Sequence, residues 1–263
     1  MSEQEILIER RGAVQWVTFN RPRARNAMTW NMYDRLVETC EEVNRDSEVR
    51  AMVITGARGE KPAFVAGTDI SQFREFTTEQ HALDYEERGD HVMRTLESVR
   101  VPTIAAIAGP CTGGGAAMAS CCDLRIASPT ARYGFPIART LGNCLSKQNY
   151  TRLFALLGMA RTKDLLLTAR LMGAEEMLSS GLAQELVSDE DSLLPRAQEL
   201  AEQLAGHAPL TMWATKESLR RVRESWLAGQ DNSDLVVGCY MSEDFKEGVE
   251  AFLGKRRPQW QGR

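Results

Sequence analysis

VPTIAAIAGPCTGGGAAMASCCDLRIAS, residues 101–128, is the stretch that decides the fold. Residues 101–108 are apolar throughout, which is typical of a parallel strand covered on both faces. The run Gly113–Gly115 follows and opens into a helix, and residues 124–127 form another short strand. A buried strand, a glycine turn, a helix and a further strand in this order predict an α/β protein.

The sequence on either side continues the pattern. Strands are expected at 13–19, 49–55 and 63–66, and helices at 30–45, 78–98, 147–157, 174–181, 192–206, 209–227 and 231–253. The strand–strand–helix order around 13–45, 49–98 and 101–120 suggests a repeated structural unit. No low-complexity linker divides the chain, so we expect one α/β core followed by a helical C-terminal part.

Composition excludes several classes of protein. The 263 residues carry a net charge of −4, which does not favour nucleic-acid binding, and no apolar run approaches membrane-spanning length. The six cysteines contain no CxxC pair, so no zinc site is expected. The N-terminal residues MSEQEILIERRG lack the apolar segment of a secretory signal. These features predict a cytoplasmic protein with free thiols.

Two short segments offer backbone N–H groups to a ligand. Gly113–Gly115 stand between a strand and a helix, where free N–H groups and the helix dipole stabilise an anionic oxygen. A tight, closely packed turn is the alternative explanation, and the sequence matches neither the Walker A nor the GxGxxG pattern. In FVAGTDI (64–70) a strand ends near Gly67 and Thr68, and Asp69 is a candidate helix cap.

Five motifs in register resemble the crotonase (enoyl-CoA hydratase/isomerase) family. They are NRPRARNAM (20–28), FVAGTDI (64–70), IAGPCTGGGAAMASCCDLRIAS (107–128), YGFP (133–136) and AFLGKRRPQW (251–260). The resemblance extends from about residue 5 to residue 260. It implies a crotonase-like spiral of strand–strand–helix units, with residues 1–200 as the core and residues 201–263 as a helical trimerisation region.

The resemblance also implies functional residues. The N–H groups of Thr68 and Gly114 correspond to the family's oxyanion hole, which holds the thioester carbonyl of an acyl-CoA. The positions expected to bind substrate or CoA are Ala24, Arg25, Ala66, Gly67, Ile70, Gly113, Phe252 and Lys255. Because CoA carries phosphates, the basic clusters at 21–25 and 255–257 are interpreted as CoA contacts, with a solvated charged face as the alternative. CoA enters as part of the substrate, so no separate cofactor and no metal are expected. A homotrimer or a dimer of trimers, and a role in fatty acid metabolism, are also implied.

The sequence differs from the family at the two positions whose side chains carry out hydration in its hydratases. Hydratases of the family use two glutamates, and the matching positions here hold Ala117 and Ile137. Neither side chain moves a proton, although hydration needs a base for water and an acid for Cα. Candidate replacements on the helix at 78–98 are Glu86, Glu87 and Asp90, for which a solvated charged face is the alternative. A bound anion or water in the space left at Ala117 is another candidate base.

The segment after YGFP is polar for a wall of the acyl pocket. Arg139, Asn143 and Cys144 are expected to face the acyl group together with Ala117 and Ile137. Arg139 could bind a carboxylate on the acyl chain. Cys144 is interpreted either as a nucleophile or as a small buried thiol, and no histidine stands near it in sequence.

The function expected from these features is that of an enoyl-CoA hydratase-like lyase. The alternatives are another reaction of the same enolate, namely decarboxylation, double-bond isomerisation or thioester hydrolysis, and a non-catalytic acyl-CoA-binding protein. Decarboxylation needs no general base, which fits the loss of both glutamates.

Overall fold

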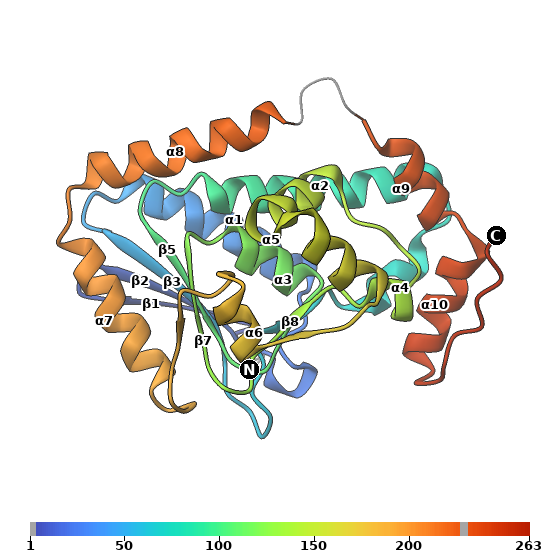
Figure 1. The fold of residues 1–263 in the computed structure, drawn as a ribbon, viewed down its shortest axis with the longest axis horizontal. Coiled ribbons are helices and arrows are strands. Elements are labelled where there is room, and N and C mark those ends of the chain that lie inside the picture. The colour runs from blue at the N-terminus through green and yellow to red at the C-terminus, as the bar shows by residue number, and fades with distance from the viewer. Residues whose placement is uncertain (1–3, 227–230) are drawn as a thin grey trace.

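Two β-sheets and ten α-helices are seen in the computed structural model, which describes residues 4–226 and 231–263 (Figure 1). The strands are β1 (Ile6–Arg11), β2 (Val14–Phe19), β3 (Ala51–Gly56), β4 (Val65–Ala66), β5 (Thr103–Ile107), β6 (Pro110–Thr112), β7 (Leu124–Ala127), β8 (Arg132–Gly134), β9 (Met172–Gly173) and β10 (Glu185–Leu186). The larger sheet has the order β1-β2-β3-β5-β7-β10, and the smaller has the order β4-β6-β8-β9. Residues 1–3 of the N-terminal stretch and residue 227 of the helix predicted at 209–227 lie outside the described residues.

The chain repeats one supersecondary unit. In each repeat a strand of the large sheet leads to a strand of the small sheet and then to a helix. The repeats are β3, β4 and α2 (Glu79–Glu97); β5, β6 and α3 (Gly114–Cys121); and β7, β8, α4 (Ile137–Thr140) and α5 (Lys147–Leu167). The predicted spiral of strand–strand–helix units is therefore confirmed.

The central strands of the large sheet are parallel and buried on both faces. On β3, Ala51 and Val53 face a cluster that includes residues of α7 (Leu193–Ala205), whereas Met52 and Ile54 face the main core beneath α1 (Trp30–Arg45). Alternate side chains of a strand point to opposite faces, so such a strand needs apolar residues at every position. This explains the unbroken apolar runs in the sequence.

Helix α3 lies at the centre of the molecule, and every residue from Gly115 to Cys121 is buried. Its sequence carries no charged residue, as expected for a helix that is enclosed on all sides. Gly115 allows the helix to approach β4 closely, since a Cβ there would lie 2.2 Å from the carbonyl oxygen of Val65. The glycine run is thus both a packing device and the start of a helix.

Side-chain caps fix where several helices begin. Thr29 accepts a hydrogen bond from the N–H of Met32 at the start of α1, and Thr78 does the same for His81 at the start of α2. Ser242 caps α10 (Glu243–Leu253), so the single helix predicted at 231–253 is wrong and consists of α9 (Ser233–Tyr240) and α10. The helix predicted at 147–157 extends to Leu167 in α5.

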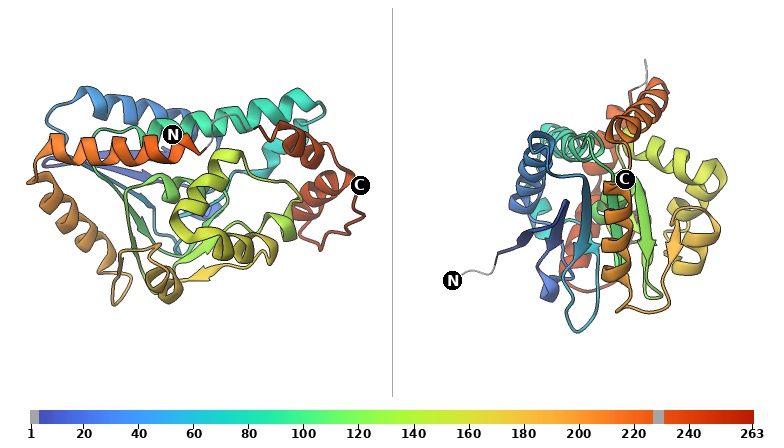
Figure 2. Two further views of the ribbon diagram at one scale, coloured as in Figure 1. Left: turned by 45° about the horizontal axis from the view of Figure 1, so that its top comes forward. Right: turned by 90° about the vertical axis from the view of Figure 1, so that its left-hand side faces the viewer.

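The C-terminal helices lie at two ends of the molecule. Helix α7 packs on the large sheet, and α8 (Pro209–Ser225) runs along the outside beside α5 (Figure 2). At the opposite end, α9 contacts α2, and α10 contacts η2 (Ile70–Glu75) and α4 (Figure 1). Residue 200, the proposed boundary of the core, lies within α7. The division into a core and a trimerisation region stays a prediction.

The structure bears on three properties considered from the sequence: membrane-spanning segments, metal sites and the state of the cysteines. None of the described helices is both long enough and apolar enough to cross a bilayer. Within residues 4–226 and 231–263, no group of three histidine, cysteine or acidic side chains is arranged to hold a metal ion. All six cysteines are free, and Cys40, Cys111, Cys121 and Cys122 are buried.

Candidate active site

The carboxyl ends of β4 and β6 bring the two predicted N–H donors together. These strands are parallel, with Ala66 paired to Thr112, so the residues that follow them run side by side. A Cβ built on Gly114 would lie 3.7 Å from the backbone nitrogen of Thr68. Two segments separated by more than 40 residues of sequence therefore meet at one point.

The N–H groups of Thr68 and Gly114 take no part in the backbone hydrogen bonds of the described segments around them. Gly114 is the first residue of α3, so its N–H has no carbonyl four residues earlier within the helix. Thr68 forms a bridge with Met28, but the bonds of this bridge run from Met28 N to Gly67 O (2.9 Å) and from Asp69 N to Met28 O (2.8 Å). Neither bond uses the N–H of Thr68. Two adjacent donors, one at a helix N-terminus, suit a developing oxyanion.

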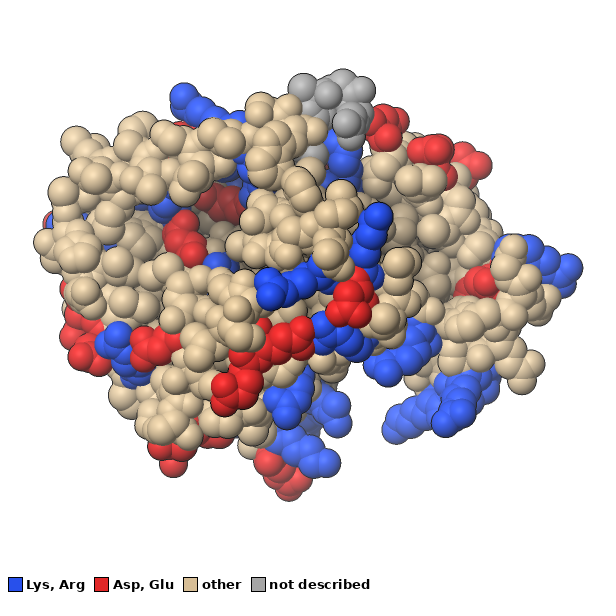
Figure 3. Space-filling model, viewed as in Figure 1, with Lys and Arg blue, Asp and Glu red and all other residues tan. Residues whose placement is uncertain are grey.

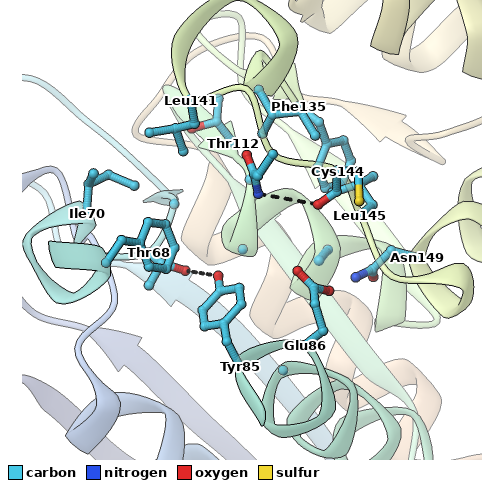
Figure 4. Close-up of a pocket in the computed structure, with 18 of the residues that line it drawn as sticks. Thr68, Ile70, Tyr85, Glu86, Thr112, Phe135, Leu141, Cys144, Leu145 and Asn149 are labelled. Atoms are coloured by element: carbon cyan, nitrogen blue, oxygen red, sulfur yellow. Dashed lines mark hydrogen bonds between the residues drawn. The ribbon is translucent and has the colours of Figure 1, made fainter. Parts of the chain in front are cut away.

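Hydroxyl groups pack directly beside these donors. The Thr68 hydroxyl lies 2.8 Å from the Tyr33 hydroxyl and 3.3 Å from the Tyr85 hydroxyl (Figure 4). Burial raises the pKa of Tyr33 to about 12, with its hydrogen bond to Thr68 acting in the opposite direction, so this phenol stays neutral near pH 7. The cluster is a chain of neutral donors and acceptors that holds the Thr68 side chain in one position.

A pocket opens in front of the two donors, between α2, α3 and the segment that links α4 to α5 (Figure 4). Most of its wall is apolar. The predicted site residues that line it are Ala66, Gly67, Thr68, Ile70, Gly113, Gly114, Ala117, Ile137, Asn143, Cys144 and Phe252.

Four predicted residues do not line the pocket. Arg139 is exposed on α4, which has only one turn and points that side chain to solvent, so the structure does not support it as a pocket residue. Ala24, Arg25 and Lys255 are also exposed outside the pocket. The carbonyl of Arg25 nevertheless accepts a 3.1 Å hydrogen bond from the N–H of Ala66 at the pocket rim.

Comparison with known proteins agrees with this geometry. The sequence model of the family described as enoyl-CoA hydratase/isomerase matches residues 9–263. This chain belongs to the enoyl-CoA hydratase/isomerase family. It is therefore an acyl-CoA enzyme with a crotonase fold.

The similar proteins include enzymes named as hydratases and enzymes named as decarboxylases. The chain is 36% identical to a short-chain-enoyl-CoA hydratase of Clostridium acetobutylicum, over 98% of this chain and 97% of the relative. It is 32% identical to a crotonyl-CoA hydratase of Syntrophomonas wolfei, over 98% of both chains. Among solved structures, a methylmalonyl-CoA decarboxylase in complex with 2-nitronate-propionyl-CoA matches with a TM-score of 0.88 and 27% identity, over 99% of both chains.

The positions of the two family glutamates lie on the pocket wall as apolar residues. Ala117 comes from α3 and Ile137 from the start of α4, and both line the pocket. Neither side chain can transfer a proton. These two positions therefore supply neither an acid nor a base to the pocket.

Glu86 of α2 is the one acidic residue on the described wall of the pocket (Figure 4). Burial raises its pKa to about 7, whereas a hydrogen bond from the Tyr240 hydroxyl lowers it and the charge of Asp90 raises it. A carboxyl with a pKa near neutrality can both accept and donate a proton at pH 7. Raised pKa values of this kind are frequent at catalytic sites.

The other two candidate acids of α2 have different surroundings. Glu87 is exposed and pairs with Arg94 at 2.7 Å. Asp90 is buried and accepts a 2.7 Å hydrogen bond from the Ser146 hydroxyl, which places it behind the wall. Of the three, only Glu86 reaches the pocket.

Sequence reasoning missed Tyr33 and Tyr240. Tyr240 ends α9, on the same helix as the buried residue Val236. Its hydroxyl donates to Glu86 at 2.5 Å and accepts from the side-chain N–H of Asn143 at 3.0 Å. The sequence signal was a buried helix face, but nothing in the sequence identified Glu86 as its partner.

Cys144 lines the pocket, and its thiol lies beside that of Cys239. The hydrogen bond with Cys239 and burial both raise the pKa of Cys144, so its thiolate is disfavoured. Since the thiolate is the nucleophilic form, these surroundings favour a half-buried, unreactive thiol over a nucleophile at Cys144.

Proposed function

We propose that this protein is a lyase that adds water to a short-chain 2-enoyl-CoA, with Glu86 as its single proton-transferring residue. The observation that carries the proposal is that Glu86, Thr68 and Gly114 line one pocket, where burial raises the pKa of Glu86 to about 7. The thioester oxygen would accept hydrogen bonds from the N–H groups of Thr68 and Gly114. The names of the hydratase relatives support the reaction.

One carboxyl is sufficient for the proton balance of hydration. As a carboxylate, Glu86 takes a proton from water while the water oxygen bonds to C3 of the enoyl group. The π electrons move onto the thioester oxygen, and the resulting enolate is stabilised by the two N–H donors. The protonated Glu86 then delivers its proton to C2, which restores the carbonyl and the carboxylate. Apolar wall residues, among them Ala117 and Ile137, keep bulk water away from the enolate.

Decarboxylation of a 2-carboxyacyl-CoA is a second candidate. Two structures of methylmalonyl-CoA decarboxylase match with TM-scores of 0.88 and 0.87, and the chain lacks both family glutamates. Loss of CO₂ also leaves a thioester enolate, and it does so without any base, so only an acid for C2 is needed. Neutral Glu86 would be that acid.

Product analysis by mass spectrometry separates the candidates. The purified protein is incubated with crotonyl-CoA and, separately, with methylmalonyl-CoA. A gain of one water on crotonyl-CoA supports hydration, whereas loss of CO₂ from methylmalonyl-CoA supports the second candidate and overturns the first. Binding of both thioesters without any product would identify a non-catalytic acyl-CoA-binding protein.

We further propose that CoA itself runs past Ala24, Arg25, Phe252 and Lys255. The arginine and lysine are exposed near the pocket rim or the end of α10, where cationic groups can pair with phosphates. Figure 3 shows Lys and Arg side chains on both sides of a notch at the lower right of the molecule. On this proposal CoA is part of the substrate and no further cofactor takes part. Loss of CoA-ester affinity at high salt would be the first sign of such phosphate contacts.

The assembly proposed is a homotrimer or a dimer of trimers in the cytoplasm, with residues 201–263 at the interface. Its support is the exposed apolar side chains of α8, namely Leu210, Trp213, Leu219 and Val222. Light scattering coupled to size-exclusion chromatography would remove this proposal if it gave only a 29.4 kDa species.

A further inference from the structure

The side-chain amide of Asn143 has a fixed orientation. Its nitrogen donates to the hydroxyl oxygen of Tyr240 at 3.0 Å and to the carbonyl oxygen of Cys144 at 3.3 Å. The hydroxyl proton of Tyr240 is already donated to Glu86, and a carbonyl has no proton to give. Both partners of Asn143 are therefore acceptors, and only the NH₂ end of the amide can face them.

The other end of the amide is left without a partner. Asn143 Oδ1 is buried and accepts no hydrogen bond from the described residues. Buried polar atoms in folded proteins nearly always have a partner, because an unpaired one costs the desolvation of that group. Since Asn143 lines the pocket, the donor that Oδ1 requires can come from a ligand in the pocket.

We propose that Asn143 Oδ1 accepts a hydrogen bond from the 3-hydroxyl group of the bound acyl-CoA, so that Asn143 selects hydroxylated acyl groups. The inference rests on the proposed hydration, in which the oxygen of the attacking water becomes this hydroxyl. Asn143 and Glu86 contact the same phenol oxygen of Tyr240, so the amide lies beside the residue that handles the water proton. The attacking water gives one proton to Glu86 and donates the other to Asn143 Oδ1, and the 3-hydroxyl that forms keeps this second hydrogen bond.

Asn149 provides a matched control in the same pocket wall. Its Oδ1 accepts from Arg152 at 3.1 Å, and its Nδ2 donates to the Ser146 hydroxyl at 3.1 Å. Both ends of this amide are satisfied within the protein. Replacing it removes an asparagine from the wall without removing an acceptor that is available to a ligand.

The test is a comparison of dissociation constants for butyryl-CoA and for each enantiomer of 3-hydroxybutyryl-CoA, measured by titration calorimetry. The titrations use the full-length Glu86→Gln protein, in which the hydroxyl ligand is not dehydrated and the glutamine oxygen still accepts from Tyr240. One enantiomer is expected to bind about tenfold tighter than butyryl-CoA, the effect of one satisfied buried acceptor. Adding Asn143→Leu should abolish this preference, and adding Asn149→Leu should keep it.

Three outcomes would overturn the inference: no preference for a hydroxyl ligand with Asn143 present, an equal loss of affinity for both ligands in Asn143→Leu, or loss of the preference in Asn149→Leu. If Asn143→Leu does not fold, Asn143→Ala removes the same oxygen without adding volume and carries the same expectation. A hydroxyl preference in a protein that yields no hydration product would retain Asn143 as a binding determinant while rejecting the proposed reaction.

Discussion

The Tyr240 hydroxyl donates a 2.5 Å hydrogen bond to Glu86 Oε1, joining two residues that are 154 positions apart in the sequence. This bond opposes the effect of burial, which raises the pKa of Glu86 to about 7. A helix near the C-terminus thereby sets the proton affinity of the carboxyl on α2. The first prediction follows from this pair.

The pH dependence of kcat/KM should report the ionisation of Glu86. Hydration begins with the carboxylate, so its rate should rise with pH and level off above about pH 7. Decarboxylation needs the neutral acid, so its rate should instead fall above that pH. Tyr240→Phe removes a hydrogen bond that stabilises the carboxylate, and the midpoint should move to higher pH. A midpoint that stays in place in Tyr240→Phe would show that another group titrates.

Removing the carboxyl of Glu86 should slow turnover strongly while leaving the fold intact. In Glu86→Gln we expect kcat to fall about 10²–10⁴-fold, because general acid–base catalysis is lost. Glu87→Gln is the matched control, since the neighbouring carboxylate is exposed and pairs with Arg94. Steady-state kinetics of both variants provide the measurement, and an equal loss in the two would contradict the role given to Glu86.

Thermal unfolding of Glu86→Gln tests the raised pKa of Glu86 independently of catalysis. The folded-state pKa of about 7 is above the ordinary value of 4.5, so folding favours the protonated carboxyl. Its contribution to stability is present below pH 4.5 and is lost as the pH rises through about 7. Glu86→Gln should therefore melt at a higher temperature than the unchanged protein at pH 8, with the difference shrinking toward pH 4.

Two substitutions at Gly114 separate the effect of losing its N–H from the effect of adding a side-chain carbon. Gly114→Ala keeps the N–H but adds a Cβ 2.4 Å from the Tyr33 hydroxyl oxygen, whereas Gly114→Pro adds that carbon and removes the N–H as well. Proline is tolerated at the first position of a helix. We expect kcat of Gly114→Pro to be about 10²–10³-fold below that of Gly114→Ala, the usual effect of losing one oxyanion donor. Equal kcat values in the two variants would place the oxyanion hole elsewhere.

Arg152 should be essential for stability. It is 1% exposed, pairs with both carboxylate oxygens of Glu97 at 3.0 and 2.8 Å, and lies 3.9 Å from Asp90. Arg223 also pairs with Glu97, so Arg152→Met removes one of two cationic partners, which should lower the free energy of unfolding by about 1.5–3 kcal/mol. Arg45→Ala breaks an exposed pair with Glu41 and should cost about 0.5 kcal/mol or less. Urea denaturation of both variants measures the difference, and similar midpoints would refute the prediction.

The sequence predicted most of the fold because its signals are local. The apolar run 101–108 and the glycine turn at 113–115 each act within a few residues. The division of 231–253 at Ser242 was missed, since a serine inside an apolar pattern does not reveal whether it caps a new helix. Strands β1, β6, β8, β9 and β10 were also missed. The last four have only two or three residues, which give no periodicity, and β1 is an edge strand with three charged residues in six.

The candidate site was only partly predictable for a different reason. Ala117 and Ile137 follow directly from motif positions, but the role of Glu86 depends on burial by segments that are distant in sequence. Its sequence neighbours Glu87 and Arg88 are charged as well, so the sequence of the helix does not single out Glu86 as the residue that faces the pocket. Arg139 was misjudged because the segment after YGFP turns into α4 and exposes that side chain.

The late position of Tyr240 has a consequence for biosynthesis. A ribosome releases the chain from its N-terminus, and domains begin to fold as they emerge. The strand ends that carry Thr68 and Gly114 are synthesised long before α9 and Tyr240. A nascent chain can therefore assemble its thioester-binding surface while the carboxyl of Glu86 still lacks its phenol partner. The hydrogen bond that lowers the pKa of Glu86 is thus supplied by a segment that is synthesised after both segments that carry the N–H donors.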